Sequence, residues 1–191
     1  MNSKAITLTE LIISSIIMTV ILAGIVSIDF ATRQSGQGTS RSAIVAMRTS
    51  AIMAHITKNA QLAKGDIMTP AYVVTPSPTE LNIAIRQEVR DTTTTPPDTS
   101  THIWVTYTYF FANRTILFCD NSPDETTLCI SGMNLGTVET LSAQLFNDPA
   151  TQQLVLEVTL TNRYDLTVPT DPINNPQMTL TSQTSPSSYS Q

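Results

Sequence analysis

An unbroken apolar run near the N-terminus is the strongest pattern in the chain. Residues 11–28 contain no charged side chain, and Ile, Leu, Val and Met predominate. A helix of this length rises about 27 Å, close to the roughly 30 Å hydrocarbon core of a bilayer. The run therefore predicts one membrane-spanning helix. Glu10 lies directly before it, and a carboxylate at a membrane boundary is costly unless it is paired, so Glu10 is a candidate functional residue.

Residues 29–64 continue the helical spacing but are amphipathic. The pattern predicts a helix that packs against its own domain. Gly36 and Gly38 each cost about 1 kcal/mol relative to Ala, so we expect the helix to bend or melt there, and Gly65 is expected to cap its C-terminus. The predicted apolar face consists of Ile44, Met47, Ala51, Ala54 and Leu62, widened by Val45, Ile52 and Ile56, with Thr49, Ser50, Thr57 and Lys64 opposite.

Beyond Gly65 the pattern changes to short strands and turns. The segment 154–161 alternates apolar and more polar positions, which is typical of a half-buried antiparallel strand. The Thr-rich segment 92–101 predicts a loop, and the Pro-rich tail from Val168 predicts an extended or frayed end. The expected class is α+β, a long N-terminal helix on a C-terminal antiparallel meander. The predicted strands are 71–74, 80–86, 102–111, 115–119, 137–146 and 152–161.

Composition and charge narrow the choice of function. Only 13% of residues are charged. Residues 1–64 hold six basic and two acidic residues, a net charge of +4, whereas residues 65–191 hold four basic and thirteen acidic residues, a net charge of −9. Such an acidic domain repels phosphate backbones, so we expect no nucleic-acid partner. The Thr- and Ser-rich composition favours a β-rich domain outside the cytoplasm.

The N-terminal segment has three interpretations. A cleaved signal peptide has an apolar region of about 7–15 residues and a small-residue cleavage site, and this run is longer with a poor site after it. A plain signal anchor leaves Glu10 unexplained. The third interpretation takes the short leader that carries Lys4 as the part removed. Flanking charge does not decide the orientation, but the cysteines and the Thr-rich domain favour a C-terminal part outside the cytoplasm.

The candidate chemical sites beyond the helix are few. Cys119 and Cys129 bracket a hairpin-like turn and predict a disulfide, and without a nearby His they predict no zinc site. His55 and His102 are expected to be structural. We find no nucleophile–His–acid arrangement and no phosphate-binding loop, so we expect no enzyme and no nucleotide cofactor.

A weak calcium pattern lies between the cysteines. Asp120, Ser122 and Asp124 have the alternating oxygen spacing of a calcium loop, and Glu125 adds charge. The glycine required at the sixth position is absent, and Ser131 stands where a bidentate Glu is needed. A solvated acidic turn is the favoured interpretation.

Residues 5–11, Ala-Ile-Thr-Leu-Thr-Glu-Leu, resemble the processing site of type IV pilins and type II secretion pseudopilins. The resemblance implies cleavage between Ala5 and Ile6 by a membrane prepilin peptidase, usually with methylation of the new N-terminus. Glu10 is then the fifth residue of the mature chain. Ala5 replaces the commoner Gly and Ile6 the commoner Phe, and the apolar run lacks the Pro of many major pilins, which favours a minor subunit.

The same resemblance implies an organisation for the whole chain. It gives a leader (1–5), a transmembrane and assembly helix (6–28), an amphipathic stalk helix (29–64) and a β-rich domain (65–191). The segments 46–63 and 174–182 are most similar to J-type pseudopilins and W-type minor pilins. Some pseudopilins are stabilised by calcium, which keeps Asp120 and Asp124 as candidates.

Glu10 acquires a specific role in this scheme. Cleavage would leave a positive α-amine on Ile6, and an amine within about 4 Å of the carboxylate in a low dielectric favours the ionised pair. Such a pair would set the axial register between neighbouring helices, whereas a Glu that only reaches the headgroups would set nothing. The implied partners are other pilin-like subunits, the prepilin peptidase and an inner-membrane assembly platform with its ATPase.

The expected localisation follows from these partners. The chain would cross the inner membrane once, with its C-terminal domain in the periplasm, and then enter a filament. One alternative is an anchored or secreted enzyme or adhesin that uses the N-terminal segment only for export. Another is an adhesin-like minor pilin that contacts a ligand through residues 92–101.

Overall fold

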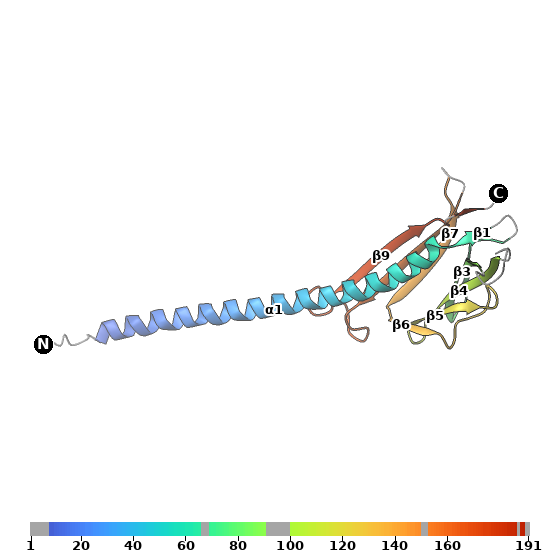
Figure 1. The fold of residues 1–191 in the computed structure, drawn as a ribbon. Helices are drawn as coiled ribbons and strands as arrows, with labels where there is room; N and C mark the ends of the chain where they lie inside the picture. The colour runs from blue at the N-terminus through green and yellow to red at the C-terminus, as the bar shows by residue number, and fades with distance from the viewer. Residues whose placement is uncertain (1–7, 66–68, 91–99, 150–152, 187, 190–191) are drawn as a thin grey trace.

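The computed structural model describes residues 8–65, 69–90, 100–149, 153–186 and 188–189 (Figure 1). A single long helix, α1 (Leu8–Gln61), projects from a β-rich body, which confirms the predicted α+β class. The strands are β1 (Lys64–Gly65), β2 (Tyr72–Pro76), β3 (Glu80–Arg90), β4 (Ser100–Phe110), β5 (Thr115–Ser122), β6 (Met133–Thr137), β7 (Thr140–Asn147), β8 (Leu154–Arg163), β9 (Gln177–Thr184) and β10 (Ser188–Tyr189).

The strands form two antiparallel sheets rather than the single meander predicted. One sheet has the order β2-β3-β4-β5-β6 and the other the order β7-β8-β9, while β1 and β10 form a short parallel pair. The predicted strand at 137–146 is divided at its start, where Val138 is completely buried and donates its backbone N–H to the carbonyl of Arg114. The chain therefore leaves the first sheet at Val138 and enters the second at Thr140.

The C-terminal part of α1 packs on these sheets through Val45, Ile52 and Ile56, which were predicted at the edge of the apolar face, whereas most of the residues predicted at its centre are exposed. Met47 and Leu62 are 74% and 54% exposed, and Ala51 and Ala54 also face solvent. Thr49, expected on the polar face, is fully buried because its hydroxyl donates to the carbonyl of Val45 at 2.7 Å. The residues that are buried are Val45, Thr49, Ile52, Met53, Ile56, Ala60 and Ala63. We call the strands and the packed part of α1 (residues 45–61) the head.

The glycines do not interrupt α1, and the prediction of a bend or melted segment at Gly36 and Gly38 is wrong. The helix continues through both positions to Gln61 without a visible kink (Figure 1). A Cβ on Gly36 would meet no atom within 4 Å, whereas one on Gly38 would lie 3.3 Å from Ile173. A glycine at position 38 thus lets a loop of the head approach the helix closely.

The helix also ends before the predicted cap at Gly65. Its last turn is closed by backbone bonds from Leu62 to Asn59 and from Ala63 to Ala60, both 3.1 Å. Gly65 instead lies in β1, where a Cβ would be only 2.7 Å from the backbone nitrogen of Ala71. Close approach of two backbone segments, rather than helix capping, explains this glycine.

The tail beyond Val168 was predicted to be extended or frayed, and its described residues include an extended, paired strand, β9. Strand β9 pairs with β8 along its length and lies against α1, where the hydroxyls of Thr57 and Ser182 are 3.1 Å apart. Three of the four tail prolines, Pro169, Pro172 and Pro176, lie in the β8–β9 connection, residues 164–176, which we call the junction loop. Asn175, 2% exposed, holds this loop together by donating to the carbonyls of Asp165, Val168 and Pro169.

Candidate functional site: the exposed stem of the helix and its junction with the head

The N-terminal half of α1 makes no contact that buries it. Every residue from 12 to 37 is exposed, and we call this segment the stem. The large apolar side chains of residues 12–30 are 47–69% exposed and lie on all sides of the helix, so no single groove of the head could cover them. The stem is long and apolar enough to cross a membrane. An apolar surface of this extent requires lipid or other apolar helices around it.

Four hydroxyl groups of the stem donate to carbonyls of the helix itself. The hydroxyls of Thr19, Ser27 and Thr32 each donate to the carbonyl four residues earlier, and Ser15 donates to Ile12, all at 2.8 Å. A helix in hydrocarbon needs such bonds within itself, because no water is present to accept hydrogen bonds from its hydroxyl groups. The first described ion pair along α1, Asp29 with Arg33 at 2.9 Å, marks the end of the apolar segment.

The residues of the predicted processing site are mostly beyond the described part of the chain. Ala5 and Ile6 lie outside the described residues. Glu10 belongs to the first turns of α1, which fixes its backbone as helical, but its side chain is not among those described. Cleavage at Ala5 and the register role of Glu10 therefore stay predictions.

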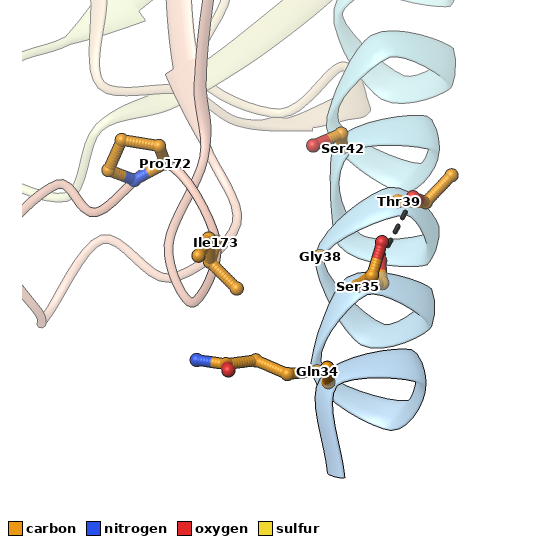
Figure 2. Close-up of a pocket in the computed structure, with 8 residues that line it drawn as sticks. Gln34, Ser35, Gly38, Thr39, Ser42, Pro172 and Ile173 are labelled. Carbon is orange, nitrogen blue, oxygen red and sulfur yellow. Dashed lines mark hydrogen bonds between the residues drawn. The ribbon is translucent and has the colours of Figure 1, made fainter. Parts of the chain in front are cut away.

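The stem enters the head at the junction loop, which the sequence had not singled out. Figure 2 shows Ile173 pointing at Gly38, beside Ser35 and above Gln34. Arg41 donates to the carbonyl of Asn174 at 2.8 Å, and its guanidinium lies 5.3 Å from the ring centroid of Tyr164, a cation–π distance. The loop and helix enclose an open groove of about 510 Å³, lined by Ala31, Gln34, Ser35, Gly38, Thr39, Ser42, Pro172 and Ile173 (Figure 2).

Two carboxylates stabilise the turns of the junction loop. Asp171 accepts the backbone N–H groups of Ile173 and Asn174, at 2.9 and 2.6 Å, and these bonds lower its pKa. Asp165 accepts the hydroxyl and the backbone N–H of Thr167, and its pKa is lowered for the same reason. Hydrogen bonds to the ionised form thus hold the loop in one conformation.

A polar and aromatic cluster joins α1 to the first sheet. The Nδ1 atom of His55 lies 2.9 Å from the hydroxyl of Tyr107, which also accepts a 2.6 Å bond from Asn59. The His55 ring meets Phe118 edge-on with centroids 4.6 Å apart. Burial and the nearby Lys58 lower the pKa of His55, and burial raises that of Tyr107. The contacts of His55 agree with the structural role predicted for it, and His102 lies exposed on β4 opposite Glu88.

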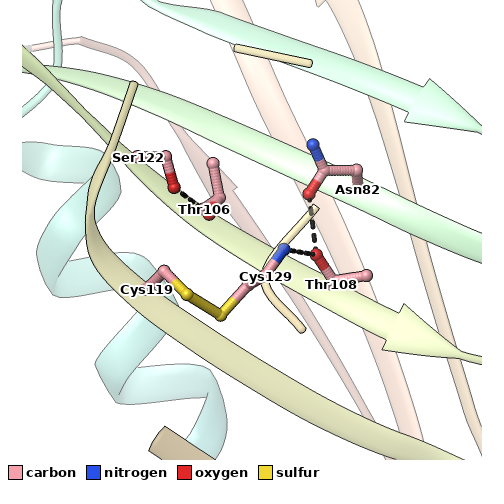
Figure 3. The surroundings of a disulfide bond; sticks show 6 residues. All are labelled: Asn82, Thr106, Thr108, Cys119, Ser122 and Cys129. Carbon is pink, nitrogen blue, oxygen red and sulfur yellow. Dashed lines mark hydrogen bonds between the residues drawn. A yellow bond between two sulfur atoms is a disulfide. The ribbon is translucent and has the colours of Figure 1, made fainter. Parts of the chain in front are cut away.

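The predicted disulfide between Cys119 and Cys129 is present. It holds a loop over the outer face of the first sheet, where Cys129 donates its backbone N–H to the hydroxyl of Thr108 at 2.8 Å (Figure 3). Thr108 in turn donates to Asn82 at 3.0 Å, and Asn82 donates to the carbonyl of Glu125. A buried polar ladder therefore lies beneath the disulfide.

The calcium pattern finds no support in this loop. The hydroxyl of Ser122 is buried against that of Thr106 at 2.6 Å (Figure 3). One carboxylate oxygen of Asp124 caps a turn by accepting from Thr126 and Thr127, bonds that lower its pKa. No group of three or more His, Cys, Asp and Glu residues within the described ranges is placed to hold a metal ion. Most of the predicted ligand-contact loop, residues 91–99, lies outside the described residues.

Comparison with protein-family models, with curated proteins and with solved structures gave no match. The geometry of the site itself is distinctive. An exposed apolar stem, with hydroxyls that bond within the helix, continues into the part of α1 that packs in a disulfide-bonded antiparallel head.

Proposed function

We propose that this chain is a minor pilin or pseudopilin, a non-enzymatic subunit that is anchored in the inner membrane and then built into a type IV pilus or a type II secretion pseudopilus. The observation that carries the proposal is the continuity of α1. The same 54-residue helix provides the apolar stem and the residues that fill the core of the head. The last four residues of the pilin-like motif, 8–11, form the first described turn of this helix.

This continuity favours a retained stem over a removable export signal. Signal cleavage after the apolar run, near residue 30, would cut α1 close to its middle, where the chain is helical on both sides. Removal of only the first five residues leaves the helix intact. The retained stem then has two successive environments, lipid before assembly and the helices of other subunits afterwards, because both can cover an apolar surface that is exposed on all sides.

Glu10 supplies the proposed register. In a bundle of apolar stems, packing alone allows neighbouring helices to slide by whole turns. A carboxylate that pairs with the N-terminal amine of a neighbour removes this freedom, because any other register leaves a charge unpaired in a low dielectric. A partner ATPase and platform protein would supply the work of extraction, and the minor subunit would help to start the filament.

A Glu10→Ala variant tests this proposal in the native host. A photo-crosslinking residue placed at Val20, in the stem, should capture other pilin-like subunits in the wild-type background and lose those products in the variant, while membrane insertion stays unchanged. Glu157→Ala, in the head, is the control and should keep the products. Unchanged cross-linking in Glu10→Ala would refute the register role.

A further inference from the structure

We infer that the junction loop rests on the outer surface of the bilayer that the stem spans, giving the subunit a second contact with lipid before it enters a filament. The inference rests on the membrane-anchored state in the proposed function. Its starting point is the composition of the loop surface: Val168 is 47%, Ile173 42% and Tyr164 38% exposed. These residues belong to the junction loop, which lies against α1 at Gly38 and Arg41, next to the stem.

Their height above the membrane can be worked out along α1. Ile28 ends the uncharged apolar run, and Ile173 packs at the level of Gly38, which is about 15 Å further along the helix. The headgroup layer beyond the hydrocarbon is about 5–7 Å thick. The loop lies roughly 10 Å from the helix axis, a normal packing distance. A tilt of about 35° toward the loop brings its tip into the headgroups, within the 0–40° range of membrane helices.

The chemistry of the loop surface suits this layer. Tyr164 combines an apolar ring with a polar hydroxyl, the property that enriches tyrosine at membrane interfaces. The charges on and around the loop nearly balance, because five arginines lie with four carboxylates: Arg33, Arg41, Arg48, Arg114 and Arg163, with Asp29, Glu139, Asp165 and Asp171. Contact should therefore depend on apolar and interfacial side chains and not on anionic lipid. Phosphatidylcholine, which is zwitterionic, is the appropriate probe.

The loop is also held firmly enough to orient the head. Asn175 closes it internally through three carbonyls, and Arg41 fixes it to the helix. Because loop and helix move together, insertion of the loop would set the direction in which α1 tilts. The head would then lie over the membrane on the side of the second sheet, and extraction into a filament would have to break this contact.

The test uses the full-length chain in phosphatidylcholine nanodiscs, with a fluorophore on a single introduced cysteine. The native cysteines are joined to each other and do not react. Ile173→Cys and Val168→Cys report on the loop, and Val20→Cys reports on the stem. Leu62→Cys is the control, because Leu62 is 54% exposed but follows the last residue of α1, at the end of the helix opposite the stem. Fluorescence of Trp104 checks that each variant is folded.

Lipid with a nitroxide on the headgroup should remove most of the fluorescence at 173 and 168 and little at 62. Lipid with a nitroxide in the acyl chain should quench the label at 20. Quenching at 20 with none at 173 and 168 would overturn the inference and leave the anchor standing. Equal quenching at 173 and 62 would also overturn it, because the head would then have no fixed orientation. No quenching at 20 would overturn both the inference and the membrane-anchored state on which it rests.

Discussion

Replacement of Ile56 by alanine should destabilise the head strongly, and replacement of Leu62 should not. Both residues carry a four-carbon side chain at the C-terminal end of the long helix, but Ile56 is 1% exposed and Leu62 is 54% exposed. The sequence pattern had placed Leu62 at the centre of the apolar face. The pair of variants therefore decides between the predicted face and the observed one.

The magnitude follows from the burial of Ile56. Truncation to alanine removes three buried carbons, about 2.4 kcal/mol at roughly 0.8 kcal/mol each. The cavity left behind adds a further cost, and buried Ile→Ala changes fall within about 2–5 kcal/mol. The better helix propensity of alanine returns less than about 0.7 kcal/mol. We expect a net loss of about 3–4 kcal/mol for Ile56→Ala, and less than about 1 kcal/mol for the half-exposed Leu62→Ala.

Urea unfolding of the full-length protein in non-ionic detergent micelles measures these values. Trp104 is the only tryptophan, is 8% exposed and lies in β4, so its fluorescence reports on the head and not on the stem. The midpoint shift at constant slope gives the change in the free energy of unfolding. Equal losses for the two variants, or a larger loss for Leu62→Ala, would refute the packing described for α1.

Three further predictions concern the head and the helix. The Cys119→Ala/Cys129→Ala double variant should lose about 2.7 kcal/mol of unfolding free energy, because the disulfide closes a loop with a sequence separation of 10. Urea unfolding of the wild type under reducing conditions should show the same loss. Burial lowers the pKa of His55, so the unfolded chain binds a proton more readily than the folded chain. The free energy of unfolding should therefore fall as the pH drops below about 6.5. His55→Gln should reduce the slope of the unfolding midpoint against pH between 7 and 5. Gly36→Ala should stabilise the helix by about 1 kcal/mol, because a Cβ there meets no atom within 4 Å, and should slow amide exchange in the middle of the helix. Unchanged exchange would argue against a continuous helix in this region.

Much of the architecture could be predicted from local patterns. The apolar run, the period-2 alternation of residues 154–161 and the paired cysteines all reflect interactions within or next to a single element. The helix, β8 and the disulfide were accordingly predicted. Each of these features is visible in the sequence because its cause lies close by in the chain.

The errors arose where distant contacts override local preference. Thr49 is buried because an intrahelical bond satisfies its hydroxyl, which hydropathy does not register. Gly38 stays helical, at a local cost, and Ile173 packs at the space its missing Cβ leaves. Asn175 turns a Pro-rich tail into an ordered loop by bonding three carbonyls. The Asp-Pro pair at 171–172 and the Asn-Pro pair at 175–176 were local signals of turns, but neither indicates the bonds that Asn175 makes across the loop.

The central claim concerns the mature N-terminus, and mass spectrometry of the protein purified from its native membrane tests it directly. If the chain is a pilin-like subunit, the N-terminal peptide should begin at Ile6, with a mass increase of one methyl group on the α-amine, and the stem should be retained. A mature terminus near residue 30 would contradict the account and identify the N-terminal segment as an export signal.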